Sequence, residues 1–194
     1  MKKERKMEQE ISRPSFLEVA FSQICEESSR STCRIQVGAG LWRADKSLIA
    51  MAHNGSLPGE PHCEDTGVGC LLINGHCKRC DHAEHNAKHY AGVREIPGGH
   101  CLSTHEPCID CFRDLVRLKI SYVGYLVEYG NNTEQEKEFM KDLCRKKGIT
   151  LEKFSSEILV VKNKILKRQQ KPGGVFTRYC PLGIKEQFPT DWGE

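Results

Sequence analysis

The feature that most constrains this chain is a pair of short segments rich in metal-binding side chains. His82 and Glu84 stand two residues apart, and Cys108 and Cys111 follow directly after Pro107. One imidazole and two thiolates can supply three zinc ligands, which leaves the fourth position of a tetrahedral zinc open for water. Because structural zinc sites lack such an open position, the pattern predicts a catalytic zinc held by His82, Cys108 and Cys111.

The spacing within each segment supports a single metal site. Cys108 and Cys111 are three residues apart, which places both thiols on one side of a helical turn. His82 and Glu84 do not share a helix face, so a metal held by the histidine does not automatically take the carboxylate as a ligand. An isolated Cys-x-x-Cys is as often structural as catalytic, and only the two segments together, in this order, predict the site.

The same residues predict a reaction. Zinc with an open position makes a nucleophile available from water at neutral pH. Glu84 would take a proton from that water, pass it to the ring nitrogen beside the carbon under attack, and later protonate the departing amine. The arrangement resembles the H-x-E and P-C-x-x-C signature of zinc-dependent base deaminases, in which the glutamate is not a zinc ligand.

Further segments, in the same order along roughly residues 16–160, resemble the deoxycytidylate (dCMP) deaminases. They are residues 30–34 (RSTCR), 37–39 (VGA), 54–56 (NGS), 62–65 (HCED), 69–70 (GC) and 76–79 (HCKR). The resemblance implies hydrolytic deamination of dCMP to dUMP on a cytidine-deaminase-like three-layer α/β/α fold. It also implies a homo-oligomer, and it leaves open whether dCTP and dTTP regulate this chain as they regulate some members.

The resemblance implies substrate contacts as well. Asn54 would contact the sugar or phosphate of the nucleotide, and Arg30 or Arg34 would bind the phosphate, for which a guanidinium fork is well shaped. Structural alternatives stay open for all three residues. Asn54 begins an Asn-Gly turn, and either arginine could be a solvated surface residue.

The chain also departs from that family. His85 and Lys88 stand where members usually have apolar residues, and the strand before the second motif is normally more apolar than residues 101–103. None of these positions belongs to the predicted zinc site. The departures therefore bear on the identity of the nucleotide and not on the metal chemistry.

The loop between His53 and Asp81 is too long for a simple connection and has no hydrophobic periodicity. Its cysteines are spaced as in structural zinc sites, and some relatives carry a second zinc in this region. We therefore expect a second, four-coordinate zinc that orders the nucleotide pocket. Its predicted ligands are Cys33, Cys63, Cys70 and Cys77, with Cys80 as the substitute if one of these is wrong. The alternative is a set of reduced, buried thiols beside a single zinc.

Length and composition indicate the class of protein. A chain of 194 residues with 38% hydrophobic residues can bury one core. Its net charge of +3 is too small to predict a membrane surface or nucleic acid as partner. Eleven cysteines without an apolar leading segment favour metal binding or free thiols over disulfides. The longest apolar runs are too short to span a bilayer, so we expect a cytoplasmic protein.

Hydrophobic periodicity and capping residues predict the order of secondary structure. Helices are predicted at residues 15–27, from 83 to before Pro97, and at 107–119, 133–147 and 155–169, and strands at 35–42, 47–52, 101–104, 122–127 and 149–154. A hairpin followed by alternating helices and strands predicts an α/β domain with a mixed sheet of about five strands and helices on its faces. We expect this deaminase domain at residues 14–170, between a disordered tail (1–13) and an irregular C-terminal tail (171–194).

Two rival functions would use the same segments. A deaminase of RNA, single-stranded DNA or a free base would share them, but binding a strand calls for a basic groove with stacking aromatics, and only 7% of the residues are aromatic. A catalytically silent zinc module used for assembly has no need of an unliganded carboxylate at Glu84. The sequence therefore favours a small-molecule nucleotide as the substrate.

Overall fold

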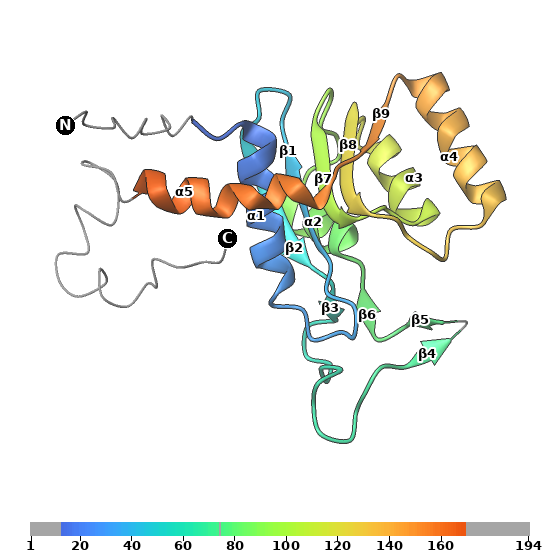
Figure 1. Ribbon diagram of the computed structural model, residues 1–194. Helices are drawn as coiled ribbons and strands as arrows, with labels where there is room; N and C mark the ends of the chain where they lie inside the picture. The colour runs from blue at the N-terminus through green and yellow to red at the C-terminus, as the bar shows by residue number, and fades with distance from the viewer. Residues whose placement is uncertain (1–12, 74, 170–194) are drawn as a thin grey trace, which may run out of the picture.

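The computed structural model describes residues 13–73 and 75–169 (Figure 1). Its helices are α1 (Phe16–Ser28), α2 (Ala83–Ala91), α3 (Ile109–Arg117), α4 (Glu134–Lys147), the 3₁₀ helix η1 (Ser156–Val160) and α5 (Val161–Gln169). Its strands are β1 (Gly38–Trp42), β2 (Leu48–His53), β3 (Gly55–Ser56), β4 (Leu72–Ile73), β5 (His76–Cys77), β6 (Cys80–Asp81), β7 (His100–His105), β8 (Tyr122–Val127) and β9 (Thr150–Lys153). The longer predicted elements are all present, whereas β3 to β6 lie where the sequence predicts only a loop.

Five strands form one mixed sheet in the order β2-β1-β7-β8-β9. The strand β1 pairs antiparallel with β2 and with β7, while β7 and β8, and β8 and β9, are parallel. The hairpin β1–β2 needs only a short turn, and the parallel pairs are connected through the helices α3 and α4. The predicted α/β class and the five-stranded mixed sheet are confirmed.

Two hydrophobic cores lie on opposite faces of this sheet, because neighbouring residues in a strand point to opposite sides. Leu41 and Cys101 pack in the core under α2, α3 and α4, whereas the next residues, Trp42 and Leu102, pack against α1. Figure 1 shows helices on both sides of the sheet. The molecule therefore has the three α/β/α layers expected from the sequence.

Close packing of α1 on β1 depends on a glycine. A Cβ atom at Gly38 would overlap the carbonyl oxygen of Ile24 in α1, so a larger residue would push the helix away from the sheet. This contact fixes the start of β1. Residues 34–37 come directly before it, and Arg34, Ile35 and Val37 line the site described below.

The first turns of the helices show one agreement with the sequence prediction and one difference. Ser15 and Glu18 form the expected capping box at α1. The helix α3 begins with Cys108 as its N-cap, so Pro107 precedes the helix and does not lie in its first turn. The sulfur of Cys108 accepts a hydrogen bond of 3.5 Å from the backbone N–H of Cys111. The N-cap of α3 is thus one of the predicted zinc ligands.

Residues 62–80, which we call the cysteine-rich segment, are held by short pairings. The strand β3 pairs with β6, and β4 pairs with β5, both antiparallel. Figure 1 shows the β4–β5 hairpin away from the five-stranded sheet, while β6 leads back to the start of α2. Two-residue strands contribute few hydrogen bonds, so other contacts must hold this segment in place.

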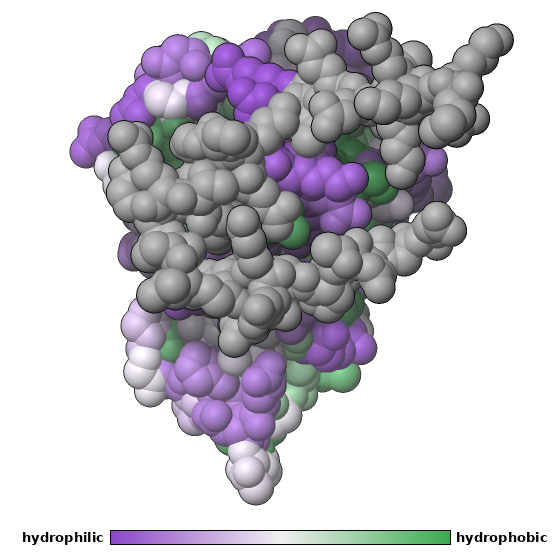
Figure 2. Space-filling view, turned by 60° about the vertical axis from the view of Figure 1, so that its left-hand side comes forward, coloured by the Kyte–Doolittle hydropathy of each residue, from purple (hydrophilic) through white to green (hydrophobic). Residues whose placement is uncertain are grey.

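On the face seen in Figure 2, the described residues are mainly hydrophilic, with hydrophobic residues in smaller areas between them. Within residues 13–73 and 75–169, no helix is both long and apolar enough to span a membrane. The predicted C-terminal tail (171–194) lies outside the described residues, as does the predicted N-terminal tail (1–13) except for Arg13. Both tails stay predictions.

Candidate active site

Two helix starts bring the predicted zinc ligands together. His82 is the N-cap of α2 and Cys108 is the N-cap of α3, and both helices pack on the same face of the sheet. The Nδ1 atom of His82 lies 3.4 Å from the sulfur of Cys108 and 3.4 Å from the sulfur of Cys111. All three ligand atoms lie within 4.8 Å of one another. The two segments singled out in the sequence therefore form one cluster.

The cluster fits a tetrahedral zinc. Typical Zn–S and Zn–N bond lengths place a sulfur and a nitrogen ligand about 3.6 Å apart around one ion. The observed separation is 3.4 Å for both cysteines. One imidazole and two thiols could therefore hold zinc with a fourth position for a ligand that is not a protein side chain.

The three ligand side chains differ in how readily each gives up its proton. The hydrogen bond from the Cys111 thiol lowers the pKa of Cys108 to about 4. The hydrogen bond to Cys108 raises the pKa of His82 to about 9, and the hydrogen bond with Cys108 also raises the pKa of Cys111 above its usual range. The thiolate form of Cys108 is therefore favoured, and the helix N-terminus adds to its stability, whereas His82 and Cys111 must each give up a proton when zinc binds.

The carboxylate of Glu84 lies beside the ligands without joining them. Glu84 is 5% exposed and lines the same pocket as His82 and Cys108. It lies outside the compact group of ligand atoms. Burial raises the pKa of Glu84 above its ordinary value, and its Oε1 accepts a hydrogen bond of 3.3 Å from Oγ of Ser103. A raised pKa suits a group that must both accept and return a proton near neutral pH.

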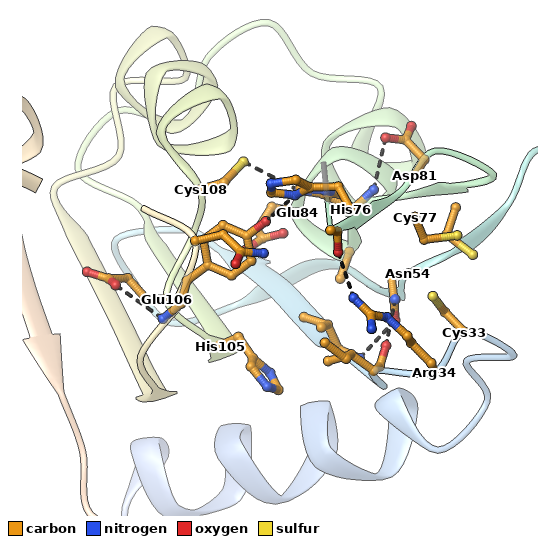
Figure 3. A pocket seen from close by; sticks show the side chains of 18 residues that line it. Cys33, Arg34, Asn54, His76, Cys77, Asp81, Glu84, His105, Glu106 and Cys108 are labelled. Carbon is orange, nitrogen blue, oxygen red and sulfur yellow. Dashed lines mark hydrogen bonds between the residues drawn. The ribbon is translucent and has the colours of Figure 1, made fainter. Parts of the chain in front are cut away.

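Of the predicted substrate contacts, Arg34 and Asn54 line this pocket and Arg30 does not. The exposed guanidinium of Arg34 donates a hydrogen bond of 2.6 Å to the carbonyl oxygen of Gly75. Figure 3 shows Arg34 and Asn54 on one side of the pocket and Cys108 on the other. The side chain of Arg30 is 70% exposed and lies 3.5 Å from Glu27. The structure therefore favours Arg34 over Arg30 as the cation available to a phosphate.

Asn54 has a structural role in the pocket wall. Its Oδ1 accepts a hydrogen bond of 2.8 Å from the N–H of Val37, and its Nδ2 donates one of 2.8 Å to the carbonyl oxygen of Ile35. These bonds hold the segment between Arg34 and β1 along the pocket. A side-chain amide can make four hydrogen bonds, so one donor and one acceptor position remain for a ligand.

Several residues to which the sequence analysis gives no role also line the pocket, among them His76, His105, Glu106 and Tyr129. The hydroxyl oxygen of Tyr129 lies 2.8 Å from Nδ1 of His76, and the backbone N–H of Tyr129 donates to Glu106 at 3.3 Å. Tyr129 follows β8, and ligand sites gather at the carboxyl ends of parallel strands. Its place in the sequence could therefore have indicated a residue of the pocket. Glu106 directly precedes the second motif. His76 belongs to the segment 76–79 that resembles the dCMP deaminases, but the sequence analysis assigns it no role, because it reaches the pocket only through the fold of the cysteine-rich segment.

A second cluster of cysteines lies at the edge of the same pocket. The sulfurs of Cys33, Cys63, Cys77 and Cys80 lie within 4.8 Å of one another. The sulfur of Cys63 is 3.7 Å from that of Cys77 and 3.4 Å from that of Cys80. Two thiolates on a tetrahedral zinc lie about 3.8 Å apart. This cluster, too, could hold a four-coordinate metal.

The second cluster differs from the set of ligands that the sequence analysis preferred for the second zinc. Cys80, the predicted substitute, belongs to the compact group, and Cys70 lies at its edge, 3.8 Å from Cys33. Pairing of β6 with β3 places Cys80 opposite Ser56, whereas Cys70 follows a turn at Gly69, whose φ is 65°. Sequence spacing alone does not rank the five cysteines, because strand pairing decides which of them meet.

The charged residues that depart from the related deaminases have a common partner. Nε2 of His85 and Nζ of Lys88 both lie 2.9 Å from Oδ2 of Asp114. His85 and Lys88 belong to α2, and Asp114 belongs to α3. Polar contacts therefore join the two helices whose first turns carry the zinc-ligand residues.

Comparison with known proteins relates this chain to deaminases. The family described as the cytidine and deoxycytidylate deaminase zinc-binding region matches residues 14–127. ComE operon protein 2 of Bacillus subtilis (strain 168) is 33% identical over 161 residues, which are 81% of this chain and 81% of that protein.

Two crystal structures of the dCMP deaminase from the cyanophage S-TIM5 are similar to this fold. The complex with dCMP and dUMP has a TM-score of 0.58 and 26% identity, and the match covers 74% of this chain and 99% of that one. The apo form has a TM-score of 0.57 and 23% identity, over 74% and 100% of the two chains. The matched family region includes both halves of the zinc-ligand cluster and the carboxylate beside it. This chain belongs to the family of zinc-binding cytidine and deoxycytidylate deaminases.

Proposed function

We propose that this protein is a zinc-dependent hydrolase that converts dCMP to dUMP and releases ammonia. The observation that carries the proposal is a single pocket lined by His82 and Cys108 of the zinc-ligand cluster, by a buried carboxylate that is not among the ligands, and by an arginine. Similarity to a dCMP deaminase whose crystal structure contains dCMP and dUMP supports the choice of nucleotide.

The residues of the pocket divide the chemistry between them. His82, Cys108 and Cys111 would hold zinc, which, when bound, activates water for attack on a ring carbon near neutral pH. Glu84 takes one proton from the attacking water and gives it to the ring nitrogen beside that carbon. The second water proton reaches the amino group through the same carboxylate, and the amine leaves as ammonia while the carbon keeps the new oxygen as a carbonyl.

A panel of substrates tests this proposal. Zinc-loaded protein is given dCMP, deoxycytidine, cytosine or a cytosine-containing single-stranded oligonucleotide, and the release of ammonia is measured with each. We expect kcat/KM to be highest for dCMP and about 10- to 100-fold lower for deoxycytidine, because the charged contact to the phosphate is missing. Preferential deamination of the oligonucleotide or the free base would favour the rival deaminase. No deamination by fully metal-loaded protein would favour a silent module.

Arg34 is expected to bind the phosphate. Replacing it with glutamine should raise KM for dCMP about 10- to 100-fold with little change in kcat, since the contact is made equally in the ground and transition states. Steady-state kinetics with deoxycytidine should show no such difference. Arg30→Gln is the matched control, because its guanidinium lies outside the pocket, and its KM should stay native. The assignment is reversed if Arg30→Gln, and not Arg34→Gln, raises KM.

The second cysteine cluster is proposed to hold a structural zinc that orders the pocket. Cys33, Cys77 and Cys80 belong to the cluster and also line the pocket. His76, beside Cys77, is hydrogen-bonded to Tyr129, which follows β8. A metal would thus fix the cysteine-rich segment, whose two-residue strands are too short to do so, and with it one wall of the pocket.

Elemental analysis tests the second zinc. Fully loaded protein should contain about two zinc ions per chain. Cys80→Ser should lose one of them and raise KM for dCMP, whereas Cys70→Ser, the matched control, should keep both. About one zinc per chain in fully active native protein would exclude the second site and leave reduced thiols. Loss of zinc in Cys70→Ser but not in Cys80→Ser would favour the ligand set first predicted from the sequence.

Three points from the sequence analysis remain to be tested. They are the predicted assembly into a homo-oligomer, the open question of regulation by dCTP or dTTP, and the predicted cytoplasmic location. The mass of the native protein in solution tests the first, and deamination rates with added dCTP or dTTP test the second. Cell fractionation tests the third.

A further inference from the structure

We propose that Ser103 is a positioning residue that holds the carboxylate of Glu84 in the orientation required for proton transfer. The inference rests on the proposed function, because it assigns Ser103 a part in the same deamination. Oγ of Ser103 donates a hydrogen bond of 3.3 Å to Oε1 of Glu84. Among the side chains that the structure describes, no other one donates a hydrogen bond to this carboxylate.

The sheet explains how Ser103 reaches Glu84. Ser103 lies on β7 two residues after Cys101, so both side chains point to the sheet face covered by α2 and α3. It has 0% exposure and pairs with Ala39 on β1 and Tyr125 on β8. A central strand therefore presents a hydroxyl to the first turn of α2, where Glu84 lies.

A serine is an unfavourable choice for this position on packing grounds alone. Fully buried positions of a central strand favour β-branched and apolar residues, and a buried hydroxyl is costly unless it is hydrogen-bonded. The bond to Glu84 satisfies the hydroxyl, and a residue that weakens its own strand is expected where it serves a site.

The two carboxylate oxygens of Glu84 differ in their hydrogen-bond partners. Oε1 accepts the bond from Ser103, whereas Oε2 has no donor among the described side chains, and the backbone N–H of Glu84 is the other donor to this carboxylate. A proton shuttle must reach the water, the ring nitrogen and the amine in turn, and a fixed carboxylate keeps each transfer distance short. Loss of the anchor should therefore lower kcat and leave KM nearly unchanged, because the effect is on the chemical steps.

Threonine and valine provide a matched pair at this position. They have nearly the same shape and strain the strand equally, but only threonine carries a hydroxyl. We expect kcat of Ser103→Val to be about 10- to 100-fold lower than kcat of Ser103→Thr, with equal KM and equal zinc content. Equal kcat in the two variants would overturn the inference.

The same pair in a second background separates positioning from a general structural effect. With Glu84→Gln already present, exchanging threonine for valine should change the residual turnover little, because the shuttle that the hydroxyl serves is gone. A further loss as large as in the native background would contradict a role through Glu84.

Crystal structures of the two variants decide the inference without a substrate. Oε1 of Glu84 should remain bonded to the threonine hydroxyl and should move away from the valine side chain. An unchanged Glu84 in Ser103→Val would overturn the inference. If the native protein fails to deaminate dCMP, the proposed function is wrong, while the position of Glu84 in these two structures still tests the role of Ser103.

Discussion

Replacing Glu84 with glutamine is expected to lower kcat for dCMP by several orders of magnitude at native zinc content. Glutamine keeps the size of the side chain and an oxygen that can accept from Ser103, but it cannot carry a proton. General acid–base catalysis typically contributes about 10²–10⁴-fold, and here the transfers to the ring nitrogen and to the amine are lost together. Single-turnover formation of dUMP measures the loss.

Glu106→Gln is the matched control for this variant. Glu106 is also buried in the pocket wall, at 8% exposure, but its carboxylate accepts the backbone N–H of Tyr129. A glutamine oxygen can accept that bond, so we expect less than about a tenfold loss. Near-native turnover by Glu84→Gln, or an equal loss in the two variants, would contradict the proton-shuttle role of Glu84.

Replacing Cys108 with alanine is expected to remove the catalytic zinc and the deaminase activity together. Two protein ligands rarely retain zinc, and Cys108 is also the thiol whose pKa is lowered to about 4. Zinc content should fall by about one ion per chain, with the second cluster still loaded, and turnover should fall in proportion to the metal lost. Elemental analysis and kinetics on the same sample measure both.

Cys144→Ala controls for the loss of a thiol as such. Cys144 is a half-buried free cysteine on α4, outside both cysteine clusters. This variant should keep its zinc and its activity. A Cys108→Ala protein with an undiminished zinc content and full turnover would show that the assigned ligands do not hold the catalytic metal.

Elements specified by neighbouring residues were predictable from the sequence. The strand β8 spans Tyr122–Val127 as predicted, and α4 begins after Thr133 and ends at Gly148, whose φ is 66°. Helix caps and hydrophobic periodicity depend on residues that are close in the sequence, so these elements can be predicted without knowledge of distant contacts. The mixed sheet followed from the order of these elements.

Contacts between distant segments were less predictable. From the sequence, Cys70 was preferred to Cys80 as a zinc ligand, and Arg30 and Arg34 were equal candidates for binding the phosphate. Spacing along the chain does not show which residues a strand pairing or a turn places at the pocket. Pairing of β3 with β6 settles the place of Cys80. Folding of residues 34–37 along the pocket distinguishes the two arginines.

In the candidate site, too, some residues could be predicted from local sequence and others depend on contacts between distant segments. His82 and Cys108 were recognisable from the fixed spacing of the motif, and the structure places Nδ1 of His82 3.4 Å from the sulfur of Cys108. Ser103 was not recognisable as a site residue, because a single serine in a strand does not indicate a function. Its role is indicated only by its position beside Glu84 in the folded sheet. A motif can thus predict the chemistry of a pocket, while the side chains that orient it emerge from packing.

The most direct test of the account is one reaction with its two products measured together. Zinc-loaded native protein is mixed with dCMP, and dUMP is followed by chromatography while ammonia is assayed in the same sample. The account predicts equal amounts of dUMP and ammonia, formed at a rate that Glu84→Gln abolishes. Native protein with full zinc at His82, Cys108 and Cys111 that leaves dCMP unchanged would contradict it.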